Sequence, residues 1–224
     1  MLKSNEMDFI YSNVKKFSFN EEYLDDNDKI WTQFALSKDC QTSTVKEKAT
    51  LLKLGYETQT HMHGFDGMTP DGRQVEVKSE TANPDQGKYG KKLNGGAGWG
   101  TKNMDTYKKL VEENPLLVHS GFTEDGKCVY VAECEFNDTK IFEQIEKYAK
   151  ARKGGANSTT KSDSNHWKDA VSLKVHYFAP KYQDRMTKPF AELISAKWRE
   201  TKKVELLAKD KEDLVELILN GGWQ

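Results

Sequence analysis

Two acidic residues and one lysine are spaced so that they could act together on a phosphate. Asp66 comes first, and Glu76 and Lys78 follow it, separated from each other by a single residue. Side chains alternate between the two faces of a β-strand, so Glu76 and Lys78 would share one face, opposite Val75 and Val77. Carboxylate oxygens suit Mg²⁺ as ligands. A nearby lysine can orient or deprotonate a water molecule, or stabilise charge that develops on a phosphate.

A tight turn would bring these residues together. The segment Thr69-Pro70-Asp71-Gly72 has the residue types of such a turn. A hairpin closed there would fold Asp66 back beside Glu76, with apolar side chains buried behind them. The pattern therefore predicts two carboxylates and one ammonium converging at a single site.

Helices are predicted before this hairpin. Apolar residues recur at helical spacing around residues 9–17 and 28–35. A third helix is expected to start at Thr44, where Thr44 and Glu47 have the spacing of a capping box, and to end at Gly55. The N-terminal third is thus expected to be helical.

The remaining chain alternates between predicted helices, strands and polar loops. Predicted strands are 116–122, 128–136 and 171–178; predicted helices are 104–113, 141–149, one entered at Pro189, and 211–220. Residues 82–103 and 150–165 are expected to be loops. This order predicts an α/β fold with a mixed central β-sheet flanked by helices. We expect a single domain over residues 1–224, with an N-terminal helical elaboration over about residues 1–40.

The motif resembles the active site of a known nuclease group. Asp66, followed by Glu76-Val77-Lys78 and preceded by a helix that carries Glu47, is similar to the motif of the PD-(D/E)xK superfamily. That superfamily includes most type II restriction endonucleases, several Holliday-junction resolvases and repair nucleases. The resemblance extends from Thr44 to Glu80 and implies a restriction endonuclease-like core. One departure is Phe65, which stands where the motif has proline.

The resemblance implies a role for each matching residue. Asp66 and Glu76 would hold one or two Mg²⁺ ions, with Mn²⁺ as a substitute and the carbonyl of Val77 as a further ligand. Lys78 would position or activate the attacking water. Glu47 resembles an extra acidic residue of part of the superfamily, although the capping box also accounts for it, and Glu80 would be a spare ligand. The implied reaction is metal-assisted, in-line hydrolysis of a phosphodiester.

Two basic loops are candidates for DNA contact, at about residues 83–103 and 154–168. Six lysines against one aspartate give residues 88–109 a charge of +5, and five basic residues against one glutamate give residues 146–161 a charge of +4. Lysines neutralise phosphates, and glycine lets the backbone approach them. Tyr89, Trp99 and Trp167 could stack on bases or wedge between them. The predicted DNA-binding residues are Lys88, Lys91, Lys92, Asn94, Trp99, Lys102, Arg152, Lys153, Lys161 and Asn165.

The overall composition indicates the cellular compartment of the protein more than it indicates its function. The chain has 34 basic and 35 acidic residues, so the overall charge gives no argument for nucleic acid. The three cysteines form no C-x-x-C pair, which favours a reducing compartment. Without an apolar N-terminal run or a membrane-length apolar stretch, the protein is predicted to be soluble and cytoplasmic.

The sequence therefore predicts a Mg²⁺-dependent DNA endonuclease of the sequence-specific, restriction type. Its partner would be double-stranded DNA, and one site per chain favours a homodimer, although a monomer could nick the strands in succession. One alternative is a structure-specific repair, recombination or phage nuclease. Another is a non-catalytic binding module for nucleic acid or protein. His61-Met62-His63 leaves a histidine-driven nuclease as a further alternative.

Overall fold

The computed structural model describes most of the chain beyond residue 41: residues 42–59, 64–83, 90–100, 104–124, 126–151 and 159–207. The predicted helices around residues 9–17, 28–35 and 211–220 lie outside the described residues. The same holds for the N-terminal elaboration over about residues 1–40 and for the pair His61 and His63.

The core is a six-stranded mixed sheet with the strand order β1-β2-β3-β5-β6-β8. Only β3 and β5 run parallel, and each of the other neighbouring pairs is antiparallel. The strands are β1 (Glu57–Thr58), β2 (Gly67–Met68), β3 (Gln74–Thr81), β5 (Leu116–Phe122), β6 (Cys128–Glu135) and β8 (Lys174–Phe178). The predicted mixed sheet is confirmed.

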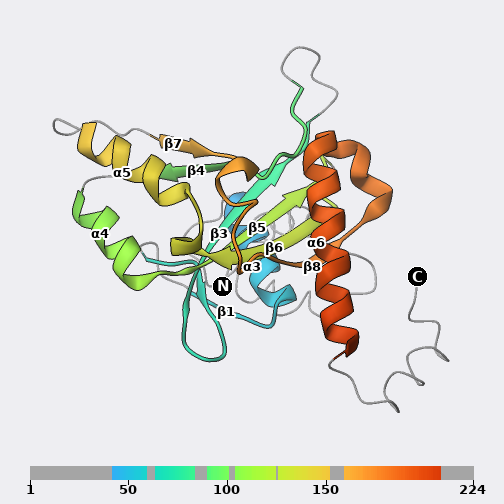
Figure 1. Cartoon of the computed structure of the whole chain (residues 1–224), viewed down its shortest axis with the longest axis horizontal. Helices are drawn as coiled ribbons and strands as arrows, with labels where there is room; N and C mark the ends of the chain where they lie inside the picture. Colours follow the sequence, from blue (N-terminus) through green and yellow to red (C-terminus); the bar gives the residue numbers. More distant parts are fainter. Residues whose placement is uncertain are drawn as a thin grey trace, which may run out of the picture.

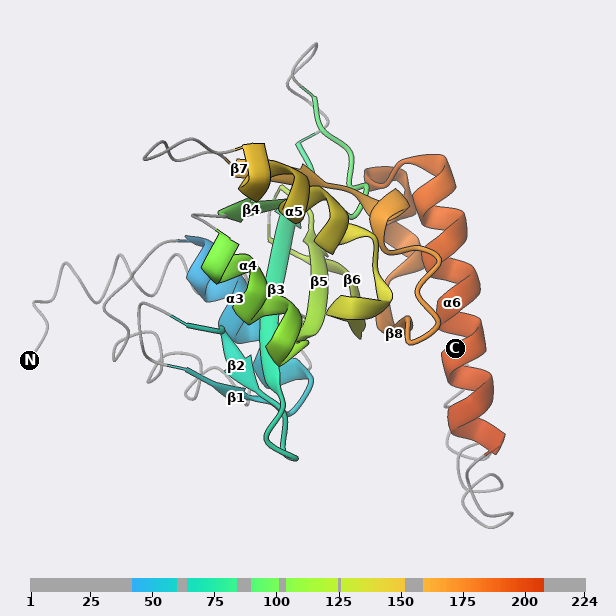
Figure 2. The same ribbon diagram turned by 60° about the vertical axis from the view of Figure 1, so that its left-hand side comes forward.

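Helices cover both faces of this sheet (Figures 1 and 2). Helix α3 (Thr42–Lys53) packs Val45, Ala49 and Leu51 against the face that carries Val75 and Val77. The opposite face packs against α4 (Met104–Glu113), α5 (Ile141–Ala151) and α6 (Lys188–Leu207). In Figure 2, α4 and α5 lie in front of β3 and α3 lies behind it. Short 3₁₀ turns occupy Phe136–Asp138, Ser164–His166 and Pro180–Arg185.

The start of α3 differs from the prediction, whereas its end agrees. The helix begins at Thr42, so Thr44 lies inside the first turn and cannot act as the N-cap of a capping box with Glu47. Gly55 has a φ of 72°, the N–H of Tyr56 donates to the Leu51 carbonyl at 2.9 Å, and the N–H of Gly55 donates to Leu52. This is a Schellman motif, which ends the helix at the predicted glycine.

The hairpin between β2 and β3 forms as predicted. The N–H of Gly72 donates to the carbonyl of Thr69 and the N–H of Thr69 donates to the carbonyl of Arg73, both at 2.9 Å. Gly72 supplies the positive φ, 88°, that the turn needs. In β3, Val75 and Val77 are fully buried while Glu76 and Lys78 are only partly buried, as the predicted alternation requires.

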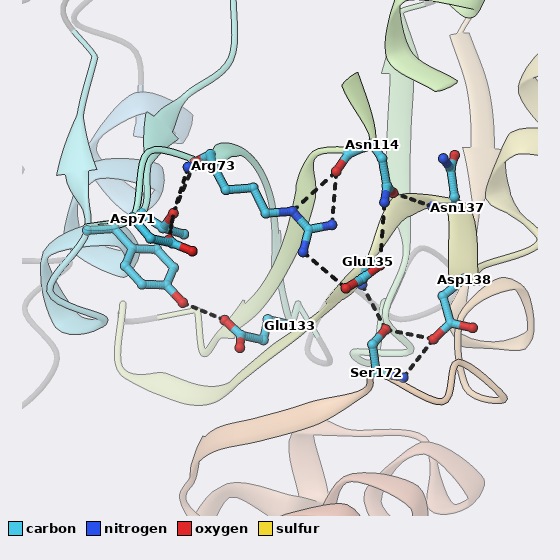
Figure 3. Close-up of polar contacts among 10 residues, drawn as sticks. Asp71, Arg73, Asn114, Glu133, Glu135, Asn137, Asp138 and Ser172 are labelled. Carbon is cyan, nitrogen blue, oxygen red and sulfur yellow. Dashed lines mark hydrogen bonds and ion pairs between the residues drawn. The ribbon is translucent and has the colours of Figure 1, made fainter. Parts of the chain in front are cut away.

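An arginine network fixes the beginning of β3 relative to its neighbours (Figure 3). The Arg73 guanidinium donates to the Asn114 carbonyl at 2.9 and 3.3 Å and to Glu135 Oε1 at 3.1 Å. Asn114 lies just before β5 and Glu135 is the last residue of β6. One side chain therefore ties three strand ends together, which restricts slippage of β3 against β5.

Two strands form where loops were predicted. β4 (Ala97–Gly100) and β7 (Thr159–Ser162) pair antiparallel as a separate two-stranded ribbon. The prediction of uninterrupted loops over 82–103 and 150–165 is therefore wrong. Each strand has only four residues, and β4 is rich in glycine, so the local sequence gives little indication of a strand. The two segments become strands because they pair with each other, although they are far apart in the chain.

Other predicted elements are confirmed with shifted ends. Helices α4, α5 and α6 and strands β5 and β6 match their predicted positions closely. Strand β8 begins at Lys174, three residues after the predicted start, because residues 171–172 form a turn. Among the described residues, none of the helices combines the length and the apolar character that crossing a membrane would require.

Candidate active site

The predicted trio meets at the edge of β3, at the point where β2 ends. The N–H of Asp66 donates to the Val75 carbonyl at 2.9 Å, which continues the ladder by one residue. Strand β2 does not extend to Val77, and the Asp66 carboxylate takes the place of a partner strand by accepting the Val77 N–H at 2.7 Å. The ammonium of Lys78 donates to Oε1 of Glu76.

A backbone carbonyl belongs to the same edge. The N–H and C=O of one residue in an extended strand point to the same side. Because the Val77 N–H points to Asp66, the Val77 carbonyl faces that edge too. Three kinds of oxygen, from Asp66, Glu76 and Val77, are thus available together.

A close approach of α3 to β2 helps to hold Asp66 in place. A Cβ atom on Gly67 would lie 2.5 Å from the Glu57 carbonyl oxygen and 2.8 Å from a methyl of Leu51. Only glycine fits between β1 and α3 at this position. The residue after Asp66 therefore allows the strand to run against the helix, which places the carboxylate at the β3 edge.

The electrostatics of the site favour a bound cation. Burial, followed by the negative charges of Glu76 and Glu47, raises the pKa of Asp66 to about 7, although Lys78 and the Val77 N–H oppose the shift. The carboxylates are thus undercompensated by the protein's own positive charges, and a divalent cation would relieve their repulsion.

Lys78 is held as an ammonium. Burial alone would lower the pKa of Lys78, but the charges of Glu76 and Asp66 and the hydrogen bond to Glu76 outweigh burial and raise it above its ordinary value. The ammonium also lies over the ring of Trp99, 5.0 Å from the centroid. A lysine in this state is suited to donate hydrogen bonds rather than to remove a proton.

Glu47 lies close enough to act on the site electrostatically. Its charge contributes to the pKa shifts of both Asp66 and Lys78. Helix α3 thus brings an acidic side chain toward the β3 edge, and because Thr44 is not the N-cap, the capping box no longer accounts for this glutamate.

Lys48 was missed by the sequence analysis. Its side chain is only 4% exposed, and its ammonium donates to the Gln59 carbonyl at 3.1 Å. Burial lowers the pKa of Lys48, while Glu47 and Asp66 attract its charge and oppose the shift. A signal was present, because Lys48 stands three residues after Val45 on the apolar face of the helix.

Glu80 has a different role from the predicted spare ligand. Its carboxylate is buried and accepts N–H groups from Asn94, Gly95 and Gly96, the shortest from Gly95 at 2.6 Å. It also accepts the Tyr130 hydroxyl at 2.9 Å and lies 3.6 Å from the Lys91 ammonium. Glu80 therefore anchors the glycine-rich segment that leads into β4, and its oxygens are engaged there.

His119 lies beside Lys78 in the β3–β5 register and is buried, with its ring stacked on Trp167 at 4.7 Å between centroids. Burial, assisted by the Lys78 charge, lowers the pKa of His119 to about 3. At His119 the folded protein therefore binds fewer protons than the unfolded chain at any pH from about 6.5 down to about 3.

Acid should consequently destabilise the fold through His119. We expect His119 to reduce the free energy of unfolding by about 1.4 kcal/mol for each pH unit below 6.5. A His119→Phe variant keeps an aromatic ring but cannot be protonated. Urea unfolding at pH 7.5, 6.0 and 5.0 should show the wild type losing stability faster than the variant below pH 6.5. Equal slopes for the two proteins would contradict the neutral, buried state of His119.

The predicted DNA-binding residues separate into four groups, of which the buried Trp99 is the last. Lys91, Lys92, Lys161 and Asn165 are exposed. Lys88, Lys102, Arg152 and Lys153 lie outside the described residues, as does Tyr89. Asn94 is half-buried, and its N–H is engaged by Glu80.

The tryptophans contradict the prediction. Trp99 is 4% exposed and Trp167 is 1% exposed, and both belong to the hydrophobic core. Neither ring has a free face on which a base could stack. These two tryptophans therefore support the fold rather than an open DNA surface.

The oxygen atoms at the edge of β3 are of the kind that binds Mg²⁺. The part of the chain that the structure describes contains no cluster of three or more acidic, histidine or cysteine residues suited to a metal. The β3 edge instead combines two carboxylates with a main-chain carbonyl. Oxygen donors beside buried, undercompensated negative charge suit Mg²⁺, which keeps several waters and needs only one or two protein carboxylates.

Comparison with known proteins adds no functional information. Neither the protein-family models nor the curated protein sequences contain a match to this chain.

Proposed function

We propose that this protein is a Mg²⁺-dependent DNA endonuclease that hydrolyses phosphodiester bonds at the edge of β3. The observation that carries the proposal is the meeting of Asp66, Glu76 and Lys78. The carboxylate of Asp66 accepts the N–H of Val77, between Glu76 and Lys78, and the Lys78 ammonium bonds to Glu76. The spacing of these residues resembles the PD-(D/E)xK motif, and the helices that flank a mixed sheet are compatible with that resemblance.

Each residue has a role that its surroundings support. Asp66, Glu76 and the Val77 carbonyl would hold the cation. When bound, Mg²⁺ supplies a water of lowered pKa and screens the phosphate charge. Lys78, kept as an ammonium, donates to the attacking water or to a phosphate oxygen and stabilises the charge that develops there.

Two charged residues of α3 adjust this site from outside the metal-binding edge. Glu47 adds negative charge near Asp66 and Lys78, which increases the attraction for a cation. Lys48 adds a buried positive charge that offsets part of it. Together these two charges adjust the electrostatic repulsion between Asp66 and Glu76.

Double-stranded DNA is the proposed substrate. Exposed lysines at positions 91, 92 and 161 lie on the glycine-rich segment that leads into β4 and on β7, the strand that pairs with β4 in the ribbon. These charges can neutralise phosphates without reading sequence. The proposal includes sequence-specific cleavage by a homodimer, because one site per chain has to cut two strands.

Incubation of supercoiled plasmid and phage DNA with the full chain tests the proposal. We expect cleavage in Mg²⁺ or Mn²⁺ and none in EDTA, with fragments of discrete length whose ends share one sequence. A Lys78→Met variant should be inactive, whereas Lys197→Met, which removes a partly buried lysine paired with Glu200 on α6, should cleave normally.

The other outcomes separate the alternatives. Cleavage confined to branched or mismatched DNA would replace sequence specificity with structure specificity. Binding without cleavage in any divalent metal, unchanged by Lys78→Met, would overturn the nuclease proposal in favour of a binding module. Cleavage of RNA but not DNA would overturn the assigned substrate.

A further inference from the structure

The ammonium of Lys78 has an aromatic neighbour that comes from a different part of the chain. Trp99 is the third residue of β4, outside the six-stranded sheet. Its ring lies under the ammonium, with 5.0 Å between the nitrogen and the ring centroid. The face of an indole attracts a cation through its quadrupole, and the attraction is strongest where water is excluded. Trp99 is 4% exposed and the Lys78 side chain is 19% exposed.

The orientation of the Trp99 ring is set by three contacts. Its indole N–H donates to the Ser162 hydroxyl on β7 at 2.9 Å, in a buried position. The ring packs against Phe136 with 6.0 Å between centroids. The backbone of Trp99 pairs with Thr160 in the ribbon. The ring is therefore held on two sides before Lys78 is considered.

We infer that Trp99 is a positioning residue that fixes the Lys78 ammonium for the proposed hydrolysis. The inference rests on the proposed function, because it assigns to Trp99 an effect on the catalytic lysine. Lys78 has a flexible four-carbon stem, and Glu76 alone would draw its ammonium along the strand toward the carboxylate. The indole face supplies a second attraction from a fixed position, so the Lys78 nitrogen is held between the Glu76 carboxylate and the Trp99 ring.

A merely structural role for Trp99 is the competing explanation. A two-stranded ribbon of four residues per strand has little stability by itself, and a buried tryptophan anchors it to the core. That role predicts loss of stability when the ring is removed, without a specific effect on the chemical step. The positioning role predicts a lower kcat in protein that is still folded.

Cleavage kinetics separate these two explanations. For Trp99→Leu we expect kcat to fall about 10- to 30-fold with KM changed less than about threefold, because a desolvated cation–π contact is lost. Trp99→Phe retains a ring face and should recover kcat to within about threefold of the wild type. Trp198→Leu removes a partly buried tryptophan of α6 that packs against Phe178, and it should leave kcat unchanged.

Three kinetic results would contradict a positioning role for Trp99. If Trp99→Leu keeps the wild-type kcat, or if Trp198→Leu lowers kcat as much at a similar melting temperature, Trp99 does not position Lys78. Equal activity of the leucine and phenylalanine variants would also overturn the inference, because only one of them has a ring. Should Trp99→Leu fail to fold, Ser162→Ala removes the partner of the indole N–H and should lower kcat less, again without a rise in KM.

A readout that does not depend on cleavage keeps the two proposals apart. In NMR spectra of the wild type, the ε-methylene protons of Lys78 should lie upfield of those of other lysines because of the Trp99 ring current, and the signal should disappear in Lys78→Met. It should return to the ordinary lysine position in Trp99→Leu. An ordinary position in the wild type would overturn the inference. An upfield signal in a protein that cleaves nothing would leave the contact in place and reject the nuclease proposal alone.

Discussion

Replacing Asp66 with asparagine is expected to abolish cleavage while leaving the protein folded and more stable. The amide oxygen can still accept the Val77 N–H, which in the wild type lies 2.7 Å from Oδ2. Asparagine lacks the negative charge that would hold Mg²⁺, so the cleavage rate should fall by about three orders of magnitude or more. DNA binding measured in Ca²⁺ or EDTA should persist.

The stability gain follows from the pKa of Asp66. Burial and the charge of Glu76 raise that pKa to about 7, far above the value in the unfolded chain. At Asp66 the folded state therefore binds more protons than the unfolded state between about pH 4 and pH 7, and the contribution of this residue to stability falls as pH rises through this range. In EDTA at pH 8 the asparagine variant should gain about 1–4 kcal/mol.

The matched control is a change of an exposed acid far from the site. Glu143→Gln on α5 removes one negative charge from an exposed position and should change neither cleavage nor stability measurably. Cleavage by Asp66→Asn at more than a few per cent of the wild-type rate would show that this carboxylate does not hold the metal. If Asp66→Asn were less stable than the wild type in EDTA, the negative charge of Asp66 would be compensated by other groups in the folded protein.

Replacing Glu80 with glutamine is expected to destabilise the protein by about 3–5 kcal/mol. The carboxylate is 4% exposed and accepts the N–H groups of three successive residues and the hydroxyl of Tyr130. The NH₂ group of a glutamine side chain would face some of these N–H and O–H donors and could not accept from them. The substitution also removes the negative charge that strengthens the remaining hydrogen bonds. Urea unfolding, followed by tryptophan fluorescence, measures the change.

The amide signal of Gly95 localises the effect. Its N–H lies 2.6 Å from Glu80 Oε1, so its proton should resonate far downfield in the wild type and move upfield in Glu80→Gln. Glu143→Gln again serves as the exposed control. A change in the free energy of unfolding below about 1 kcal/mol, with the Gly95 signal unmoved, would mean that the glycine-rich segment is held by other contacts.

Local features were predictable because local residues determine them. The turn at Thr69 to Gly72 and the alternation of Val75 and Val77 with Glu76 and Lys78 depend on neighbours within a few residues. The end of α3 at Gly55 depends on a single residue that can take a positive φ. The prediction that Asp66 returns to the strand beside Glu76 followed from these features together, and the residues do come together there.

Distant pairings were not predictable in this way. β4 and β7 are strands only because Ala97–Gly100 finds Thr159–Ser162, and nothing in either segment specifies the other. The burial of Trp99 and Trp167 follows from that ribbon and from the core around it, so an interpretation of these rings as DNA contacts failed. Glu80 likewise meets its backbone donors only because the chain returns at residues 94–96.

The sequence by itself determined which chemical groups the site contains and the strand that aligns them, since residue type and the two-residue period of a strand are local properties. The tertiary structure alone decided their electrical state. Burial and the negative charges of Glu76 and Glu47 raise the pKa of Asp66, and the carboxylates around Lys78 raise the pKa of that lysine. Desolvation and charge interactions depend on what packs around a group, and that information exists only once the chain has folded.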